Sequence, residues 1–130
     1  MIKFAYTILY VQDVIRAIDF YEKAFGLSRK FIAPDNTYGE LLTGGTTLSF
    51  ASIDLAKKNI KEGFIESSLN NKSFAIEIGF TTEDVEQAIK SAVNAGAVIV
   101  ENTKAKPWGQ IVAYVRDLDG FLIEICTPME

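Results

Sequence analysis

The sequence YVRDLDGFLIEI, at residues 114–125, predicts a β-strand, a tight turn and a second β-strand. Asp-Leu-Asp-Gly is typical of a turn, because Asp hydrogen-bonds nearby backbone and Gly accepts a positive φ. Apolar residues flank the turn on both sides. Glu124 stands inside the second apolar run, between Ile123 and Ile125. A carboxylate in such a strand lies either on a solvated face or in a binding site, and the rest of the sequence is needed to choose.

Length and composition predict one globular domain. The chain has 130 residues, of which 48% are hydrophobic and 12% aromatic, enough to bury a core. The net charge is −4 and no basic cluster exists, which argues against nucleic-acid binding. No apolar run approaches the ~18 residues of a membrane span. A single cysteine, Cys126, and no signal peptide at the start of the sequence predict a cytoplasmic protein, with Cys126 in core packing.

The sequence contains no histidine. Histidine is the commonest metal ligand and the commonest acid–base group near neutral pH. A zinc site of the usual His or Cys type therefore cannot be built from one chain. A Ser-His-Asp triad is excluded for the same reason.

The order of predicted elements repeats once along the chain. Alternation over residues 3–11 predicts a strand whose two faces are both at least partly buried. A helix follows, with Asp13 as N-cap and Gly26 as C-cap. The second half repeats this order, with Thr81 or Thr82 capping its helix. The remaining predicted ranges are strands 28–33, 38–43, 46–51, 73–81, 98–102, 110–117 and 121–127, and helices 14–25 and 83–95.

Both halves follow the order strand, helix, strand, strand, strand, and both helices open with Asp-Val-x-x-Ala-Ile. We predict a single α+β domain, residues 1–130, built from two tandem βαβββ modules that form a curled mixed sheet around a cleft. Module one spans about 1–52 and module two about 73–130. The polar stretch 53–72 is predicted to connect them, irregular apart from a short helical turn.

Three motifs, LYVQDV at 9–14, AxxFYxxxFGL at 17–27 and VRDLDGFLIE at 115–124, resemble those of the vicinal oxygen chelate superfamily. This superfamily contains glyoxalases, bleomycin-resistance proteins and extradiol dioxygenases, and the resemblance covers essentially the whole chain. The Pro-Trp-Gly at 107–109 is most similar to the bleomycin-resistance and related uncharacterised branch. The resemblance implies the glyoxalase/bleomycin-resistance fold.

In metal-dependent members of that superfamily, four ligands line the cleft, one from each of four strands. The resemblance places these positions at Tyr6, Ser49, Ala75 and Glu124, and only Glu124 has a ligand's side chain. We therefore expect no metal or other cofactor. The alternative is a divalent metal held weakly by Glu124 and Glu77, since Glu77 is two residues from Ala75 and shares its face. Glu40 is a further strand carboxylate whose face the sequence does not determine.

Alternation and the resemblance together predict a cleft face that is rich in aromatic residues and has carboxylates at its base. Aromatic rings provide contact area and attract cations, so such a face suits a flat or cationic small molecule. The residues expected on it are Tyr6, Tyr10, Ser49, Glu77, Trp108, Tyr114 and Glu124.

Two functions remain open, beside a purely interacting or degenerate role. The first is a metal-free, homodimeric protein that captures a small organic molecule, as the resemblance to bleomycin-resistance proteins implies. The second is a glyoxalase-like lyase, isomerase or dioxygenase. That enzyme would use a divalent metal, or Glu124 as the catalytic base with Tyr6 or Tyr114 as proton donor. The sequence does not determine whether any reaction is catalysed.

Overall fold

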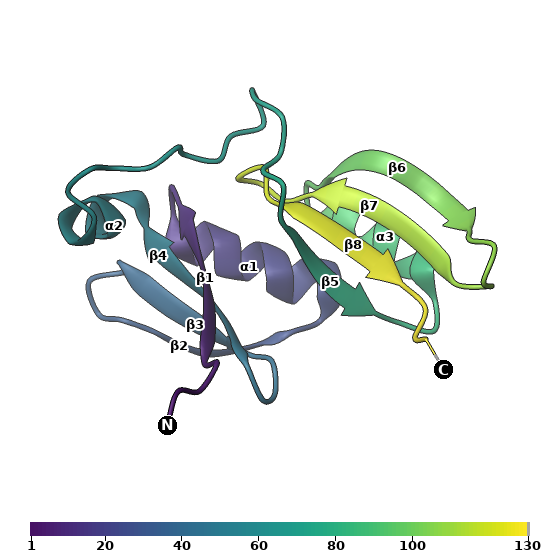
Figure 1. The fold of residues 1–130 in the computed structure, drawn as a ribbon, viewed down its shortest axis with the longest axis horizontal. Helices are drawn as coiled ribbons and strands as arrows, with labels where there is room; N and C mark the ends of the chain where they lie inside the picture. Colours follow the sequence, from purple (N-terminus) through teal and green to yellow (C-terminus); the bar gives the residue numbers. More distant parts are fainter. Residues whose placement is uncertain (130) are drawn as a thin grey trace. The chain divides into compact units, whose positions relative to one another are not determined.

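The computed structural model, which describes residues 1–129, shows two βαβββ modules, each with its own four-stranded mixed sheet (Figure 1). The chain divides into two compact units. One comprises Met1–Glu22 and Gly26–Glu66, and the other Lys23–Phe25 and the chain from Ser67 onward. The predicted α+β class and repeated module are confirmed, and a cleft shared by the modules stays a prediction. None of the described helices is both long and apolar enough to span a membrane.

The first sheet has the strand order β1-β4-β3-β2. Strands β1 and β4 run parallel, because a helix and two antiparallel strands separate them in the chain. The elements of this module are β1 (Tyr6–Val11), α1 (Val14–Phe25), β2 (Ser28–Ile32), β3 (Tyr38–Leu42), β4 (Thr47–Ser52) and α2 (Ile53–Asn59).

Helix α1 packs on one face of the first sheet. The rings of Tyr21 and Phe50 lie 5.2 Å apart, and both side chains are fully buried. Gly39 leaves room for Ile18, whose Cδ1 atom lies 2.5 Å from where a Cβ of residue 39 would stand. The opposite face, which we call the open face of the first sheet, therefore presents the alternate residues: Tyr6, Ile8, Tyr10, Tyr38, Glu40, Leu42, Thr47, Ser49 and Ala51.

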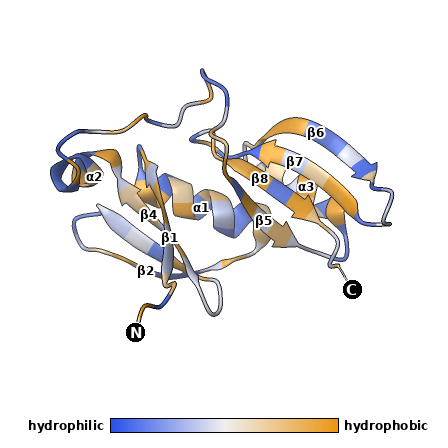
Figure 2. Ribbon diagram, in the orientation of Figure 1, coloured by the Kyte–Doolittle hydropathy of each residue, from blue (hydrophilic) through white to orange (hydrophobic). Residues whose placement is uncertain are grey.

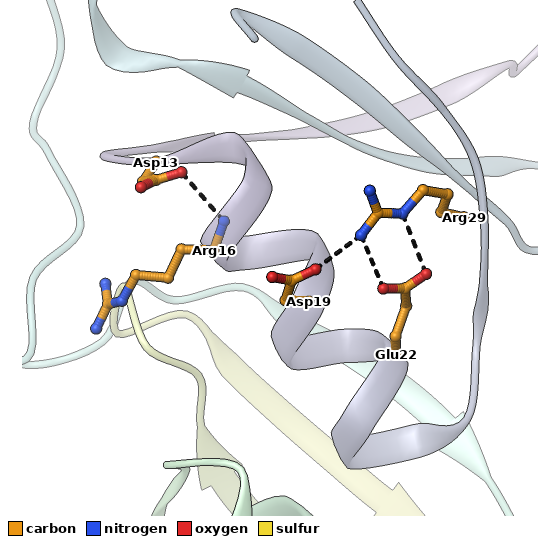
Figure 3. A network of polar contacts seen from close by, with 5 residues as sticks. All are labelled: Asp13, Arg16, Asp19, Glu22 and Arg29. Carbon is orange, nitrogen blue, oxygen red and sulfur yellow. Dashed lines mark hydrogen bonds and ion pairs between the residues drawn. The ribbon is translucent and has the colours of Figure 1, made fainter.

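Helix α1 begins and ends as its sequence predicts. The Asp13 carboxylate accepts a hydrogen bond from the backbone N–H of Arg16 at 3.1 Å, and Gly26 has a φ of +67°. On the outer side of the helix, Arg29 pairs with Asp19 at 2.7 Å and with Glu22 at 2.9 Å (Figure 3). These pairs are partly exposed, so they add little to stability.

The second sheet repeats this topology in the order β5-β8-β7-β6, again with its first and last strands parallel. Its elements are β5 (Glu77–Thr81), α3 (Val85–Asn94), β6 (Val98–Ala105), β7 (Ile111–Arg116) and β8 (Leu122–Cys126). Helix α3 contacts β6, β7 and β8. Val115, Ile123 and Ile125 are buried, and β7 and β8 are largely hydrophobic in Figure 2. The alternate residues, including Glu77, Tyr114 and Glu124, lie on the open face of the second sheet.

The predicted turn between the last two strands is confirmed. The buried Asp117 carboxylate accepts a hydrogen bond from the backbone N–H of Phe121 at 2.9 Å, and Gly120 has a φ of +91°. The guanidinium of Arg116 donates to the carbonyl of Gly120 at 2.9 Å and to that of Ser68 at 3.0 Å. The hairpin therefore fixes the end of the connector as well as joining two strands.

The N-cap predicted for the second helix is wrong. The cap is Asp84, whose carboxylate accepts from the backbone N–H of Gln87 at 3.0 Å. The hydroxyl of Thr82 instead accepts from the N–H of Asp84 at 3.2 Å and so supports the cap from outside the helix. An aspartate at position 84 can reach the first free N–H groups of the helix, and a threonine two residues earlier cannot.

Two further predictions need correction. Both faces of the first strand were expected to be partly buried, but Phe4, Tyr6 and Ile8 are 70%, 53% and 42% exposed. The strand expected from residue 73 begins only at Glu77. In the connector, the predicted helical turn is the seven-residue helix α2, whose N-cap is Ser52.

Candidate functional site

Strand pairing brings Glu77, Tyr114 and Glu124 onto the open face of the second sheet. Glu124 stands opposite Tyr114 on β7 and opposite Gly79 on β5. Residues opposite each other in a ladder point to the same face, and so do residues two apart in a strand. Glu77 therefore shares the face of Gly79 and Glu124. Three of the predicted site residues are brought together in this way.

The phenol of Tyr114 donates a hydrogen bond to Oε1 of Glu124 at 2.8 Å. This bond, together with burial and the negative charge of Glu124, raises the pKa of Tyr114 to about 12. The phenol thus stays protonated at neutral pH and holds the carboxylate in one orientation.

The second carboxylate, Glu77, is electrostatically coupled to the first. Partial loss of hydration raises the pKa of Glu77, and the charge of Glu124 and a hydrogen bond to it raise it further. Within residues 1–129, neither carboxylate has an ion-pair partner. The open face of the second sheet therefore carries two carboxylates without an ion pair, and Arg116 on the same face instead bonds the carbonyls of Gly120 and Ser68.

Cys126 lies two residues beyond Glu124 on the same face. Its thiol is buried and donates to the carbonyl oxygen of Phe80 at 3.7 Å. Burial and the neighbouring Glu124 raise the pKa of this thiol, which keeps it neutral and weakly nucleophilic. The expected packing role of Cys126 agrees with this environment.

Trp108 lies in the loop between β6 and β7 and is 65% exposed. Its indole N–H donates to Oε1 of Gln110 at 2.9 Å, and Nε2 of Gln110 donates to the carbonyl of Thr127 at 2.9 Å. These bonds fix the ring beside a hollow of about 520 Å³ that Pro128 and Met129 also line. A larger hollow of about 680 Å³ lies beside α3 and β6 and contains none of the predicted site residues.

The other predicted site residues, Tyr6, Tyr10 and Ser49, lie on the open face of the first sheet. Tyr6 is 53% exposed. The ring of Tyr10 packs against that of Phe64, with centroids 4.8 Å apart. Ser49 is fully buried, and its hydroxyl donates to the carbonyl of Thr7 at 3.4 Å.

The sequence prediction missed Tyr38 and left the orientation of Glu40 open. The Tyr38 hydroxyl donates to Oε2 of Glu40 at 2.7 Å, and Glu40 is only 7% exposed. Burial raises the pKa of Tyr38, and the hydrogen bond to Glu40 and its charge raise it too, which outweighs the lowering by a hydrogen bond with Ser49. Both residues face the same way because they are two apart in β3, but only the pairing of Glu40 with Ser49 shows that this is the open face.

The pairing of β1 with β4 matches that of β5 with β8 residue by residue. This match corrects one of the four positions that the resemblance implied for metal ligands. Tyr6 pairs with Thr47, two residues before Ser49, and Glu77 pairs with Leu122, two residues before Glu124. Glu77 is therefore the equivalent of Tyr6, whereas Ala75 was expected and lies before β5 begins.

The four positions implied for metal ligands become Tyr6, Ser49, Glu77 and Glu124. Two of them are carboxylates and none is histidine. No group of three or more His, Cys, Asp or Glu side chains that could hold a metal occurs in residues 1–129. Two carboxylates supply too few ligands for the geometries that divalent metals prefer, so the donor set does not fit a chelated metal.

Known proteins resemble the chain over nearly its whole length. Lactoylglutathione lyase GLX1 of Arabidopsis thaliana is 28% identical over 127 residues, which are 95% of this chain and 43% of that protein. The chain thus spans less than half the length of this curated relative.

Among solved structures, a glyoxalase-related enzyme from Fulvimarina pelagi has a TM-score of 0.83 at 19% identity, covering 98% of this chain and 89% of that one. The hypothetical protein SA1046 from S. aureus has a TM-score of 0.77 at 25% identity, covering 98% and 95%. The model of one family matches residues 3–125. The chain belongs to that family, the Glyoxalase/Bleomycin resistance protein/Dioxygenase superfamily.

Proposed function

We propose that this chain is a small-molecule-binding protein that captures an aromatic or cationic organic ligand without a metal, with Glu124 at the base of the site. One observation supports this most directly. Two carboxylates, Glu77 and Glu124, share an open sheet face and have no ion-pair partner in the described part of the chain. A cation bound between them would relieve their mutual repulsion.

The other predicted site residues have side chains that suit recognition of such a ligand. Tyr114 fixes the orientation of Glu124 by its 2.8 Å hydrogen bond, so less freedom is lost when a ligand binds. Trp108 offers an exposed ring for a flat group, and its orientation is fixed by Gln110. Tyr6, Tyr10 and Ser49, on the open face of the first sheet, remain predicted ligand contacts.

The donor set supports binding without a metal. The sequence has no histidine, and the two carboxylates fall short of a chelate. A positively charged ligand group would take the place that a metal ion has in other members. A homodimer, a cytoplasmic location and kinship with the bleomycin-resistance branch remain predictions.

A second candidate is an enzyme, which the 28% identity to a lactoylglutathione lyase favours. In that case Glu124 would accept a proton from a carbon acid of the substrate. The phenol of Tyr114 would donate a hydrogen bond to the developing oxyanion. The Tyr114–Glu124 bond would then have to open so that the phenol could turn toward the substrate.

A thermal-shift screen against small aromatic amines and neutral aromatics, run with divalent metals and again with a chelator, tests the proposal. Ligands that bind the native state raise the melting temperature by mass action. We expect stabilisation by amines that persists in chelator and is lost in Glu124→Gln. Glu62→Gln, which removes the same charge from an exposed loop residue, serves as the matched control. Stabilisation that requires a metal would overturn the metal-free proposal and favour the enzyme.

A further inference from the structure

The outer edge of the second sheet is formed by β6, and α3 packs beside it (Figure 1). Between these two elements lies the hollow of about 680 Å³. Ile89, Val93 and Ile99 give it apolar surface, and Val93 and Ile99 are 41% and 42% exposed. We call the residues that line this hollow, together with the rest of β6, the α3–β6 edge. An exposed apolar patch with polar residues around it is typical of an interaction surface.

On α3, Glu86 and Lys90 line the hollow with opposite charges. They are four residues apart, in the order that favours an ion pair along a helix. Both are exposed, and neither has an ion-pair partner within residues 1–129. Asp84, the other charged residue of the hollow, is already engaged as the N-cap of α3. Glu86 and Lys90 are therefore available to charges on a partner.

On β6, Glu101 and Lys104 repeat this pattern on the other face of the sheet. Glu101 stands opposite Tyr114 and Lys104 opposite Val112, so both lie on the side of the open face. They too are exposed and have no ion-pair partner in the described part of the chain. The ladder with β7 is irregular on both sides of Glu101. Such irregularities hinder the addition of a further strand, so a partner would contact this edge through side chains.

The order of charges along β6 is self-complementary. A two-fold axis that crosses the strand between Asn102 and Thr103 places Glu101 of one copy opposite Lys104 of a second copy. The symmetry creates the same pair again on the other side of the axis. A symmetric dimer interface requires a surface that complements itself in this way.

The same axis also matches the charges on α3. Because α3 and the centre of β6 line one hollow, the hollows of the two copies meet at the axis, with the two α3 helices antiparallel on either side of it. Glu86 of one copy is then directed toward Lys90 of the other. Val93 and Ile99 lie in the joined hollow, where contact with the second copy would remove apolar surface from water. One symmetry operation thus complements both faces of the edge.

We propose that the α3–β6 edge binds a second copy of this chain in a symmetric dimer. Exposed ion pairs contribute little to affinity, so the apolar residues of the hollow supply most of it. The charges select the orientation, because a shifted alignment of the two edges leaves them unpaired. The interface uses neither Glu77 nor Glu124, so it does not depend on the function proposed above.

Sedimentation velocity of the full chain at neutral pH, from about 1 µM to about 1 mM, measures the self-association. We expect a dimer whose dissociation constant rises with added salt, because exposed charges are screened. Lys104→Glu should weaken the dimer by at least about tenfold, because it places like charges opposite each other twice in each dimer. Glu101→Lys should have the same effect. The variant with both changes should associate within about twofold of the original chain, because its charges complement each other again.

Two substitutions outside the edge serve as controls. Lys61→Glu and Glu62→Lys make the same charge changes at exposed residues and should leave the dissociation constant unchanged. Recovery in the double variant excludes a folding defect as the cause of the loss in the single variants. A monomer over the whole concentration range, or a double variant as weak as the single ones, would overturn the proposal. A dimer that the single variants leave unchanged would also overturn it, because association would then use another face.

Engineered cysteines test the position of the axis. Asn102→Cys and Thr103→Cys place a thiol next to the axis, so mild oxidation should link two copies by a disulfide in at least one of these variants. Lys61→Cys should stay unlinked under the same conditions. The native Cys126 is buried and does not compete. Equal cross-linking in all three variants, or none in the two at the axis, would show that the edge does not meet a second copy as proposed.

Discussion

Tyr114 and Glu124 stand directly opposite each other in the ladder between β7 and β8, and the phenol donates a 2.8 Å hydrogen bond to the carboxylate. The backbone register sets their distance, so the pair exists before any ligand arrives. A hydrogen bond to an ionised acceptor is stronger than one between neutral groups. The pair should therefore be detectable in both the titration and the stability of the free protein.

The first prediction concerns Tyr114. Its pKa of about 12 in the folded chain exceeds the ~10 of an unfolded tyrosine. The stabilisation is therefore fully present below about pH 10 and is lost as pH rises toward 12. Tyr114→Phe should lower the free energy of unfolding by about 1 kcal/mol near neutral pH, with a smaller difference at high pH. Urea denaturation across pH measures this, and phenolate absorbance reports the ionisation.

Tyr6→Phe is the control, because that phenol is 53% exposed. It should leave the free energy of unfolding unchanged. An equal loss in both variants would show that the hydrogen bond to Glu124 contributes nothing.

The second prediction concerns Glu77, whose pKa is raised in the folded chain. A raised carboxyl pKa means that the folded state binds the proton more tightly than the unfolded state. The ionised group then lowers stability as pH rises from about 4.3, the ordinary value, through the folded value. Glu77→Gln should make the protein more stable near neutral pH and leave stability unchanged below about pH 4. Urea denaturation at both pH values measures the free energy of unfolding, with Glu62→Gln as the control. An equal change in both variants would show that the site of Glu77 is not special.

The third prediction concerns two strand glycines. A Cβ on residue 39 would stand 2.5 Å from Cδ1 of the fully buried Ile18, whereas a Cβ on residue 79 would meet nothing within 4 Å. Gly39→Ala should cost about 1–3 kcal/mol of stability through overpacking. Gly79→Ala should be neutral or slightly stabilising, because alanine restricts the unfolded chain. Similar denaturation midpoints for the two variants would contradict the packing of α1 described above.

The fourth prediction concerns the hairpin at Gly120. Its φ is +91°, and an added Cβ would lie 2.8 Å from the carbonyl carbon of Ser68 and 3.0 Å from the N of Leu69. Gly109 has a similar φ of +94° but open space around it. Gly109→Ala should cost about 1 kcal/mol from backbone strain alone. Gly120→Ala should cost clearly more, because the backbone of the connector must also move. Thermal melts of the two variants give the comparison.

Much of the fold could be predicted because it depends on local patterns. Alternation gave the strands, and the Asp13 cap and Gly26 gave the ends of the first helix. The exposure of Tyr6 and Ile8 could not be predicted, because β1 alternates between two sets of apolar residues. Only the position of α1 shows which set is covered. The cap of the second helix was wrong because Thr82 and Asp84 are both good capping residues at neighbouring positions.

The candidate site was predictable only in part. Glu124 could be recognised within its apolar strand, and Glu77 because it lies two residues from Ala75. The role of Tyr38 was missed, although its partner Glu40 lies only two residues along the same strand. Its contact with Ser49 depends on the register between β3 and β4, which a single sequence does not encode in any short motif.

The row-by-row match of the two ladders also bears on the ancestry of the chain. When a gene segment is duplicated, every position exists twice, and one copy can drift while the other keeps its role. Each module has a tyrosine–carboxylate pair, but Tyr38 and Glu40 share one strand, whereas Tyr114 and Glu124 come from two. Equivalent rows thus hold different amino acids. On the open faces the correspondence of the two halves is therefore visible in ladder position, whereas in the helices it is visible in the shared Asp-Val-x-x-Ala-Ile motif.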